Sequence, residues 1–194
     1  MTAHRLISPR EFRRMPWKNG GGHAAEIAAW PDGAHDGFAW RVAIADIERD
    51  GPFSTYAGVD RTFVLLDGDG VVLTHDDVEV ALTVPHEPYR FAGEATCRCR
   101  LVGGPSRAYN LMVRRDRARG TLVVTDAPYA APGPFRFGVL YAASGASECL
   151  LPAHAPIALA PGAALVTDGA GATMHVNPVD GGAVAIVAML DADG

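Results

Sequence analysis

Apolar and polar side chains alternate with a period of two over much of this chain. The clearest case is a run in which Phe38, Trp40, Val42 and Ile44 alternate with smaller or polar residues. A period of two places successive side chains on opposite faces of an extended strand. Similar short runs follow, and 22 glycines and 14 prolines punctuate the sequence between them. Many short strands joined by Gly/Pro turns are typical of a sandwich or barrel, so we predict an all-β fold.

The same patterns give approximate bounds for the strands. Asp-Gly-Asp-Gly at 67–70 predicts a hairpin turn between strands at 61–66 and 71–74. Residues 8–13 are an exception, because Ser8, Pro9 and Glu11 predict one helical turn with a capping box. The remaining extended segments are expected at 78–84, 88–91, 97–102, 109–113, 121–125, 135–142, 148–151, 157–160, 164–167 and 183–190.

A short basic stretch at 114–119 divides the chain. Beyond it charged residues become fewer and Ala, Gly and Val more frequent, so we expect one half at 1–115 and another at 116–194. Residues 63–74 and 157–167 are both predicted to form a strand, a Gly turn and a second strand that ends in Thr. This echo is compatible with a duplicated β-barrel, although any two hairpins look somewhat alike.

Composition and charge exclude several classes of partner. Hydrophobic residues make up 48% and charged residues 20%, as in soluble globular proteins. A formal charge of −5 argues against binding to nucleic acid or anionic membranes. No apolar run approaches the roughly 20 residues that span a bilayer, and the N-terminus lacks the apolar core of a signal peptide. We therefore expect a cytoplasmic protein.

The three cysteines, Cys97, Cys99 and Cys149, cannot all pair within the chain. No further Cys or His follows them at zinc-ligand spacing, so we expect reduced and buried thiols.

Residues 15–26 read Met-Pro-Trp-Lys-Asn-Gly-Gly-Gly-His-Ala-Ala-Glu. Glycines are useful where φ is positive or where a group approaches the backbone closely. Trp17, Lys18 and Asn19 could stack on, charge-pair with and hydrogen-bond a small polar ligand. The alternative is a tight turn into a strand, with Trp17 buried and Lys18 in solvent. Arg41, in the middle of a predicted strand, either extends outward or points into a ligand cavity.

Six ordered motifs between residues 10 and 115 resemble those of the HutD/Ves family. They are Pro16–Gly22 with Glu26-Ile27, Trp40-Arg41, Asp50–Ser54, Gly58–Thr62 with Leu66–Gly68, Phe91–Glu94, and Asn110–Arg115. The resemblance implies a cupin-superfamily protein with two β-barrel halves in one chain, a bicupin. It also implies a link to histidine utilisation or stress response and a regulatory role through a small ligand, with formylglutamate as one candidate.

Two positions depart from the family pattern. Ala24 stands where the family usually has Thr, followed by Ala25 in place of a common Arg. Ala108 stands where an acidic residue often precedes the Asn of the Asn-x-Met strand. Each change removes a polar group, so the ligand can differ from that of other members.

The metal-binding pattern of cupins, G-x5-H-x-H-x(3,4)-E-x6-G, tests for a metal site. Aligning its last glycine on Gly68 places Arg61 at the glutamate and Ser54 and Tyr56 at the two histidines. These are poor transition-metal ligands, and no two of the seven histidines are spaced as H-x-H or H-x(3)-H. We therefore expect no metal and no cofactor.

Arg61 at that position would instead aim a permanent cation at the barrel interior, with a fork that matches carboxylate or phosphate. Arg41, Arg114 and Lys18 could add to it. The alternative is a structural ion pair of Arg61 with Asp60, Asp67 or Glu26. The predicted ligand-binding residues are Trp17, Lys18, Asn19, Glu26, Arg41, Arg61, Asn110, Met112 and Arg114; the last three share one face of a strand, where Met112 could also be core.

Three functions fit these residues. The first, which we favour, is a non-enzymatic protein that binds a small anionic metabolite, such as an acyl-amino acid or dicarboxylate, and modulates catabolism. The second is a metal-independent isomerase, lyase or hydrolase in which Glu26 is a general base and Lys18 or Arg61 stabilises an anionic transition state. The third is a structural or partner-binding module with a vestigial pocket. A homodimer is plausible in each case.

Overall fold

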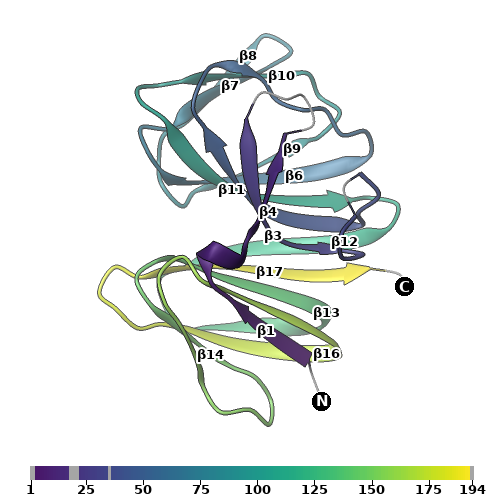
Figure 1. Ribbon diagram of the computed structural model, residues 1–194, viewed down its shortest axis with the longest axis vertical. Helices are drawn as coiled ribbons and strands as arrows, with labels where there is room; N and C mark the ends of the chain where they lie inside the picture. The colour runs from purple at the N-terminus through teal and green to yellow at the C-terminus, as the bar shows by residue number, and fades with distance from the viewer. Residues whose placement is uncertain (1–2, 18–21, 35, 193–194) are drawn as a thin grey trace. The chain divides into compact units, whose positions relative to one another are not determined.

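The computed structural model describes residues 3–17, 22–34 and 36–192 (Figure 1). Their regular elements are strands, apart from one 3-10 turn at Pro9–Glu11 (η1), which agrees with the predicted helical turn. None of the described residues forms a helix long and apolar enough to cross a membrane. The strands are β1 (Ala3–Ile7), β2 (Arg13–Pro16), β3 (His23–Trp30), β4 (Trp40–Ile47), β5 (Gly51–Pro52), β6 (Val59–Asp67), β7 (Val71–His75), β8 (Val78–Leu82), β9 (Pro88–Ala92), β10 (Cys97–Leu101), β11 (Ser106–Arg114), β12 (Ala118–Thr125), β13 (Tyr129–Ser144), β14 (Ser147–Leu150), β15 (Ile157–Leu159), β16 (Ala164–Pro178) and β17 (Val184–Ala192).

The chain divides into two compact units. The first unit is Arg13–Arg117, and the second is Met1–Phe12 with Ala118–Gly194. The start of the chain therefore groups with the C-terminal half, whereas the sequence pattern placed it with the first half. The reason is strand pairing, since β1 runs antiparallel to β16 with Ala3 opposite Asp168 and Ile7 opposite Ala164.

The first unit contains a six-stranded sheet, in the order β2-β3-β4-β11-β6-β9, and a four-stranded sheet, in the order β5-β10-β7-β8. Apolar residues of both sheets form one buried cluster, with Phe63 and Leu65 from the first sheet and Leu73, Cys97 and Cys99 from the second. Cys97 and Cys99 are buried and free, as is Cys149 in the second unit, which confirms the expected reduced thiols.

The predicted hairpin at residues 61–74 is wrong, although both strands exist. β6 pairs with β9 and β11, whereas β7 pairs with β8 and β10, so the Asp-Gly-Asp-Gly turn carries the chain from one sheet to the other. Gly68 and Gly70 have φ of 92° and 89°. A Cβ at Gly70 would lie 2.3 Å from the Leu82 carbonyl oxygen, so both the backbone angle and the close approach require glycine.

The second unit is built on one seven-stranded sheet, in the order β12-β17-β13-β16-β14-β15, with β1 also paired to β16. Its core consists of apolar side chains such as Leu140, Leu165, Met174 and Val187. β13 and β16 are longer than the sequence pattern predicted. They continue through irregular pairing between Ala131 and Phe137, a stretch whose Gly and Pro residues look like a strand end in the sequence. The echo segment at 157–167 also joins two strands, β15 and β16, that do not pair with each other.

Candidate functional site

Three neighbouring strands of the six-stranded sheet bring two arginines into one cross-strand row. Met112 on β11 lies opposite Arg41 on β4 and opposite Arg61 on β6. Both arginines are buried and line a cavity of about 40 Å³, enough for roughly three water molecules. The residues that line it are Trp17, Ala24, Arg41, Ala43, Ala45, Phe53, Ser54, Tyr56, Arg61, Asn110 and Met112.

Arg61 is only 8% exposed, and its hydrogen-bond partners are neutral. Nη1 donates to the Ser54 carbonyl oxygen at 3.2 Å, and Nη2 donates to Asn110 Oδ1 at 3.1 Å. Nε is buried without a hydrogen-bond partner among the described residues. Burial lowers the pKa of Arg61 to about 10, so the side chain is still a cation at neutral pH.

Aromatic rings surround the Arg61 guanidinium. Its central carbon lies 4.9 Å from the Phe91 ring centroid, 5.3 Å from that of Phe53 and 5.8 Å from that of Tyr56. Ring faces attract a cation but leave its N–H donors available. The guanidinium is therefore held in place without being neutralised.

The alternative considered for Arg61, an ion pair with Asp60, Asp67 or Glu26, is not formed. Asp60 pairs with Arg115 at 2.6 Å, Asp67 accepts a hydrogen bond from the Gly68 amide at 2.8 Å, and Glu26 pairs with other arginines. Within the described ranges no carboxylate lies at ion-pair distance from Arg61. None of the described residues therefore supplies a counter-charge to this cation.

Glu26 is buried next to the cavity and pairs with one of its arginines, Arg41. The side chain is 4% exposed and is not among those lining the cavity. Its Oε1 lies 2.6 Å from Arg13 Nη2, and its Oε2 lies 3.2 Å from Arg41 Nε. A carboxylate held between two guanidinium groups is already engaged, which disfavours a general-base role for Glu26. Glu26 pairs with Arg13 and Arg41, and Arg61 is a third guanidinium that lines the same cavity as Arg41, so these four side chains together carry net positive charge.

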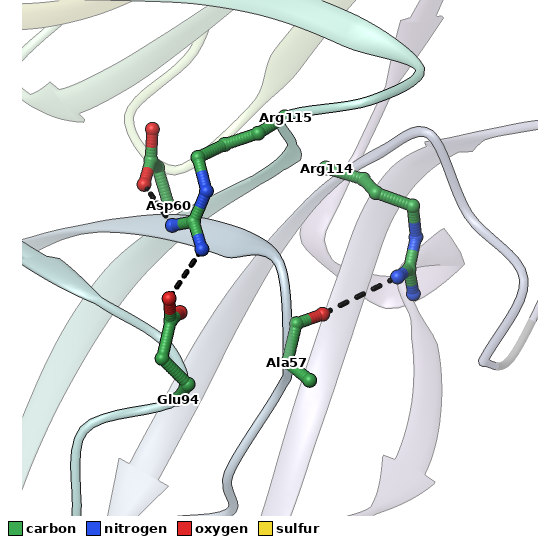
Figure 2. A network of polar contacts seen from close by, with 5 residues as sticks. All are labelled: Ala57, Asp60, Glu94, Arg114 and Arg115. Carbon is green, nitrogen blue, oxygen red and sulfur yellow. Dashed lines mark hydrogen bonds and ion pairs between the residues drawn. The ribbon is translucent and has the colours of Figure 1, made fainter.

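Arg114 does not line the cavity, although it shares the alternation of Asn110 and Met112. It lies at the end of β11, where backbone carbonyl groups surround it. Nε donates to the Phe38 oxygen at 3.2 Å, Nη2 to the Asp36 oxygen at 3.0 Å and Nη1 to the Ala57 oxygen at 3.4 Å. Figure 2 shows the contact with Ala57. Arg114, which was predicted to bind the ligand, instead links the loop at 36–38 to the loop at Ala57.

Arg115, which the sequence pattern did not single out, forms a second link of this kind (Figure 2). It bridges Asp60, the neighbour of Arg61, and Glu94. The hydrogen bond from Arg115 lowers the pKa of Glu94 below its usual value. Next to Glu94, the Gly93 oxygen accepts a hydrogen bond from the Tyr56 amide at 2.7 Å. These contacts hold the backbone of residues 53–56, of which Phe53, Ser54 and Tyr56 form one wall of the cavity.

The wall residues Ser54 and Tyr56 could have been found in the sequence. Alignment to the cupin metal pattern placed them, with Arg61, at the three ligand positions, and all three line the cavity. The pattern therefore located three positions on the cavity, although Ser54, Tyr56 and Arg61 are not metal-ligand residue types. In the part of the chain that the structure describes, no group of three or more His, Cys, Asp or Glu could hold a metal ion. This donor set does not fit a cupin-type metal.

The glycine-rich stretch contributes Trp17 to the cavity. Its ring lies 6.0 Å from that of Phe53 in an edge-on arrangement, and its amide donates to the Gly22 oxygen at 2.9 Å. A Cβ at Gly22 would lie 3.1 Å from the Trp17 ring, so glycine permits this close packing. Lys18 and Asn19 lie outside the described residues.

The chain is similar to a family of known proteins. The family model HutD matches residues 9–185. A 21.2 kDa protein from the hutC 3′ region of Pseudomonas putida is 38% identical over 148 residues, 76% of this chain and 78% of the relative. Protein Ves of Citrobacter koseri is 36% identical over 140 residues, 70% of this chain and 72% of the relative.

Solved structures with a similar fold include a member of the same family. HutD from Pseudomonas fluorescens SBW25 has a TM-score of 0.84 at 30% identity, covering 99% of this chain and 100% of that one. Oxalate decarboxylase of Bacillus subtilis has a TM-score of 0.61 at 8% identity, covering 97% and 77%, a likeness of fold alone. The predicted all-β cupin fold is thus confirmed. Because the family model spans most of the sequence and the relatives match over most of their length, the chain belongs to the HutD/Ves family of cupin-fold proteins.

Proposed function

We propose that this protein binds a small organic carboxylate at Arg61 and acts through binding instead of catalysis. The observation that carries the proposal is a buried guanidinium whose described partners are neutral. Taking a charge out of water costs several kcal/mol unless an opposite charge compensates it. A bound carboxylate would supply that charge.

The chemistry around Arg61 suits a carboxylate. The planar guanidinium can donate two parallel hydrogen bonds to two carboxylate oxygens, and its Nε donor is not otherwise used by a described residue. Asn110 accepts from Arg61 through its carbonyl oxygen, which leaves its NH₂ group as a further donor. Arg41, on the same row, adds a second cation beside the cavity.

The relatives suggest where such binding would matter. One relative is described by its position beside hutC, and the Pseudomonas fluorescens HutD structure is described as a formate condition. Formate is the smallest carboxylate. We place this chain in the cytoplasm, where it would bind a carboxylate of histidine catabolism, with N-formylglutamate as one candidate, and modulate flux through the pathway. The proposal requires no metal or cofactor.

Calorimetric titration near neutral pH tests this proposal. Formate, glutamate, N-formylglutamate and urocanate would be titrated into the wild-type protein, Arg61→Met and Arg100→Met. The control makes the same chemical change at an exposed arginine of β10. We expect binding of at least one carboxylate and a loss of about 100-fold or more in Arg61→Met, since charge-assisted hydrogen bonds contribute roughly 1.5–3 kcal/mol each.

Arg100→Met should bind as the wild type does. If no organic anion binds, or if Arg61→Met binds as tightly as the control, the proposal is wrong. Conversion of any of these compounds by the wild-type protein would instead support a metal-independent enzyme.

A further inference from the structure

The cavity of the first unit has two chemically different ends. Arg61, Asn110 and Arg41 lie at the first end, which is polar and cationic. The opposite end is formed by small apolar side chains. Ala24 on β3 lies opposite Ala45 on β4, two residues beyond Ala43.

The strand geometry fixes the order of these groups. Along β4 the cavity-lining residues are Arg41, Ala43 and Ala45, spaced roughly 7 Å apart. On β11, Met112 shares the row of Arg41, and Asn110 shares the row of Ala43. The lining therefore changes along the strands from guanidinium, through amide, to methyl groups.

An aromatic side chain covers the methyl end. Trp17 packs on the buried cluster of Met15, Ala24 and Ala43. Its ring also lies against that of Phe53. None of the described side chains that line this end carries a charge. Space exists here because the alanines are short, and a larger side chain at Ala24 would occupy it.

We propose that the preferred ligand is a monocarboxylate with a short apolar body. Its carboxylate binds Arg61 and Asn110, and its body lies on Ala24, Ala43 and Ala45 beneath Trp17. This inference rests on the proposed function and narrows its ligand class to monocarboxylates, so it disfavours the dicarboxylate N-formylglutamate as the ligand. A second carboxylate on the body would meet methyl groups and an indole, where an unpaired charge is costly.

The size of the cavity limits the length of the body. About 40 Å³ holds roughly three water molecules, which suits an acid of about two to four carbons. Each methylene buried on the apolar end is expected to tighten binding about fourfold. Carbons beyond the cavity would reach solvent and add little.

A chain-length series measured by calorimetry tests the inference. Formate, acetate, propionate, butyrate and succinate would be titrated into the wild-type protein. We expect affinity to rise about fourfold per carbon from formate to propionate or butyrate, and succinate to bind at least tenfold more weakly than butyrate.

Two variants test whether the apolar body of the ligand lies on Ala24. Ala24→Val fills the apolar end and should weaken butyrate binding about tenfold while formate binding changes less than twofold. Ala25→Val is the matched control, because Ala25 is the next residue of β3 and does not line the cavity. It should leave both affinities unchanged. If Ala24→Val does not fold, the wild-type series alone still decides.

The outcomes separate the two proposals. If formate binds but affinity is independent of chain length, or if succinate binds as tightly as butyrate, this inference is wrong and carboxylate binding stands. If the butyrate affinity falls equally in both alanine variants, the placement of the body is wrong. If no carboxylate binds, both proposals are wrong.

Discussion

The two units of this chain are both built from antiparallel strands, yet their interiors differ. Among its described residues, the first unit buries six polar or charged side chains: Glu26, Arg41, Arg61, Thr62, Ser106 and Asn110. In the described part of the second unit, the buried polar side chains are Ser147 and Thr167, neither of which is charged. The first interior contains a cavity lined by arginine, while the second consists of an apolar cluster.

This difference is the reason that we propose a ligand site in the first unit. Buried apolar side chains stabilise a fold, whereas buried charges cost free energy unless they are paired. A β-sheet unit can form without buried charged side chains, as the described part of the second unit illustrates. The buried arginines of the first unit therefore support the proposed ligand site, because functional sites are where proteins depart from optimal packing.

The largest predicted effect comes from breaking the buried pairs of the first unit. Glu26→Gln should lower the free energy of unfolding by about 3–5 kcal/mol, because Arg41 would remain buried without its carboxylate. The control Glu79→Gln removes an exposed partner of Arg100 and should cost within about 1 kcal/mol. Urea unfolding measures both. Equal effects would show that the Glu26 pairs are not structural.

In the second unit a core truncation should affect stability but not binding. Leu165 is fully buried in the apolar cluster, so Leu165→Ala should lower the free energy of unfolding by about 2–5 kcal/mol. Carboxylate affinity of the folded variant should match that of the wild type by calorimetry. A loss of affinity comparable to that of Arg61→Met would remove the functional distinction between the units.

A smaller effect is expected from pH. Burial lowers the pKa of Arg61 to about 10, and a bound anion favours the protonated form. Carboxylate affinity should therefore be nearly constant from about pH 6 to 9 and fall toward tenfold per unit above about pH 10. Calorimetry across this range measures it. A steep fall between about pH 6 and 8 would instead implicate a histidine.

Much of the site could be predicted from strand alternation. The period of two placed Asn110 and Met112 on one face, and the cupin spacing placed Arg61 toward the interior; all three line the cavity. Arg114 obeyed the same alternation but lies where the strand ends, so the pattern could not tell a cavity wall from a link between loops.

Pairing of distant segments could not be predicted in this way. Arg61 and Asn110 are 49 residues apart and meet only because β6 and β11 are neighbours. The Asp-Gly-Asp-Gly turn has the residues of a hairpin, yet it joins two sheets, since local turn chemistry does not determine which strands pair. The pairing of β1 with β16 could not be predicted for the same reason, since it joins segments far apart in the sequence.

Stabilisation by ligand tests the central claim most directly. Free energies of unfolding would be measured for the wild type and Arg61→Met, with and without formate or propionate at about 100 times the wild-type Kd. The wild type should gain about 2.7 kcal/mol from the ligand and Arg61→Met close to none. Without ligand, Arg61→Met should lose no more than about 1 kcal/mol, because removing a buried unpaired charge offsets the lost hydrogen bonds. Equal stabilisation of both proteins by the carboxylate would contradict the assignment of Arg61 as its binding residue.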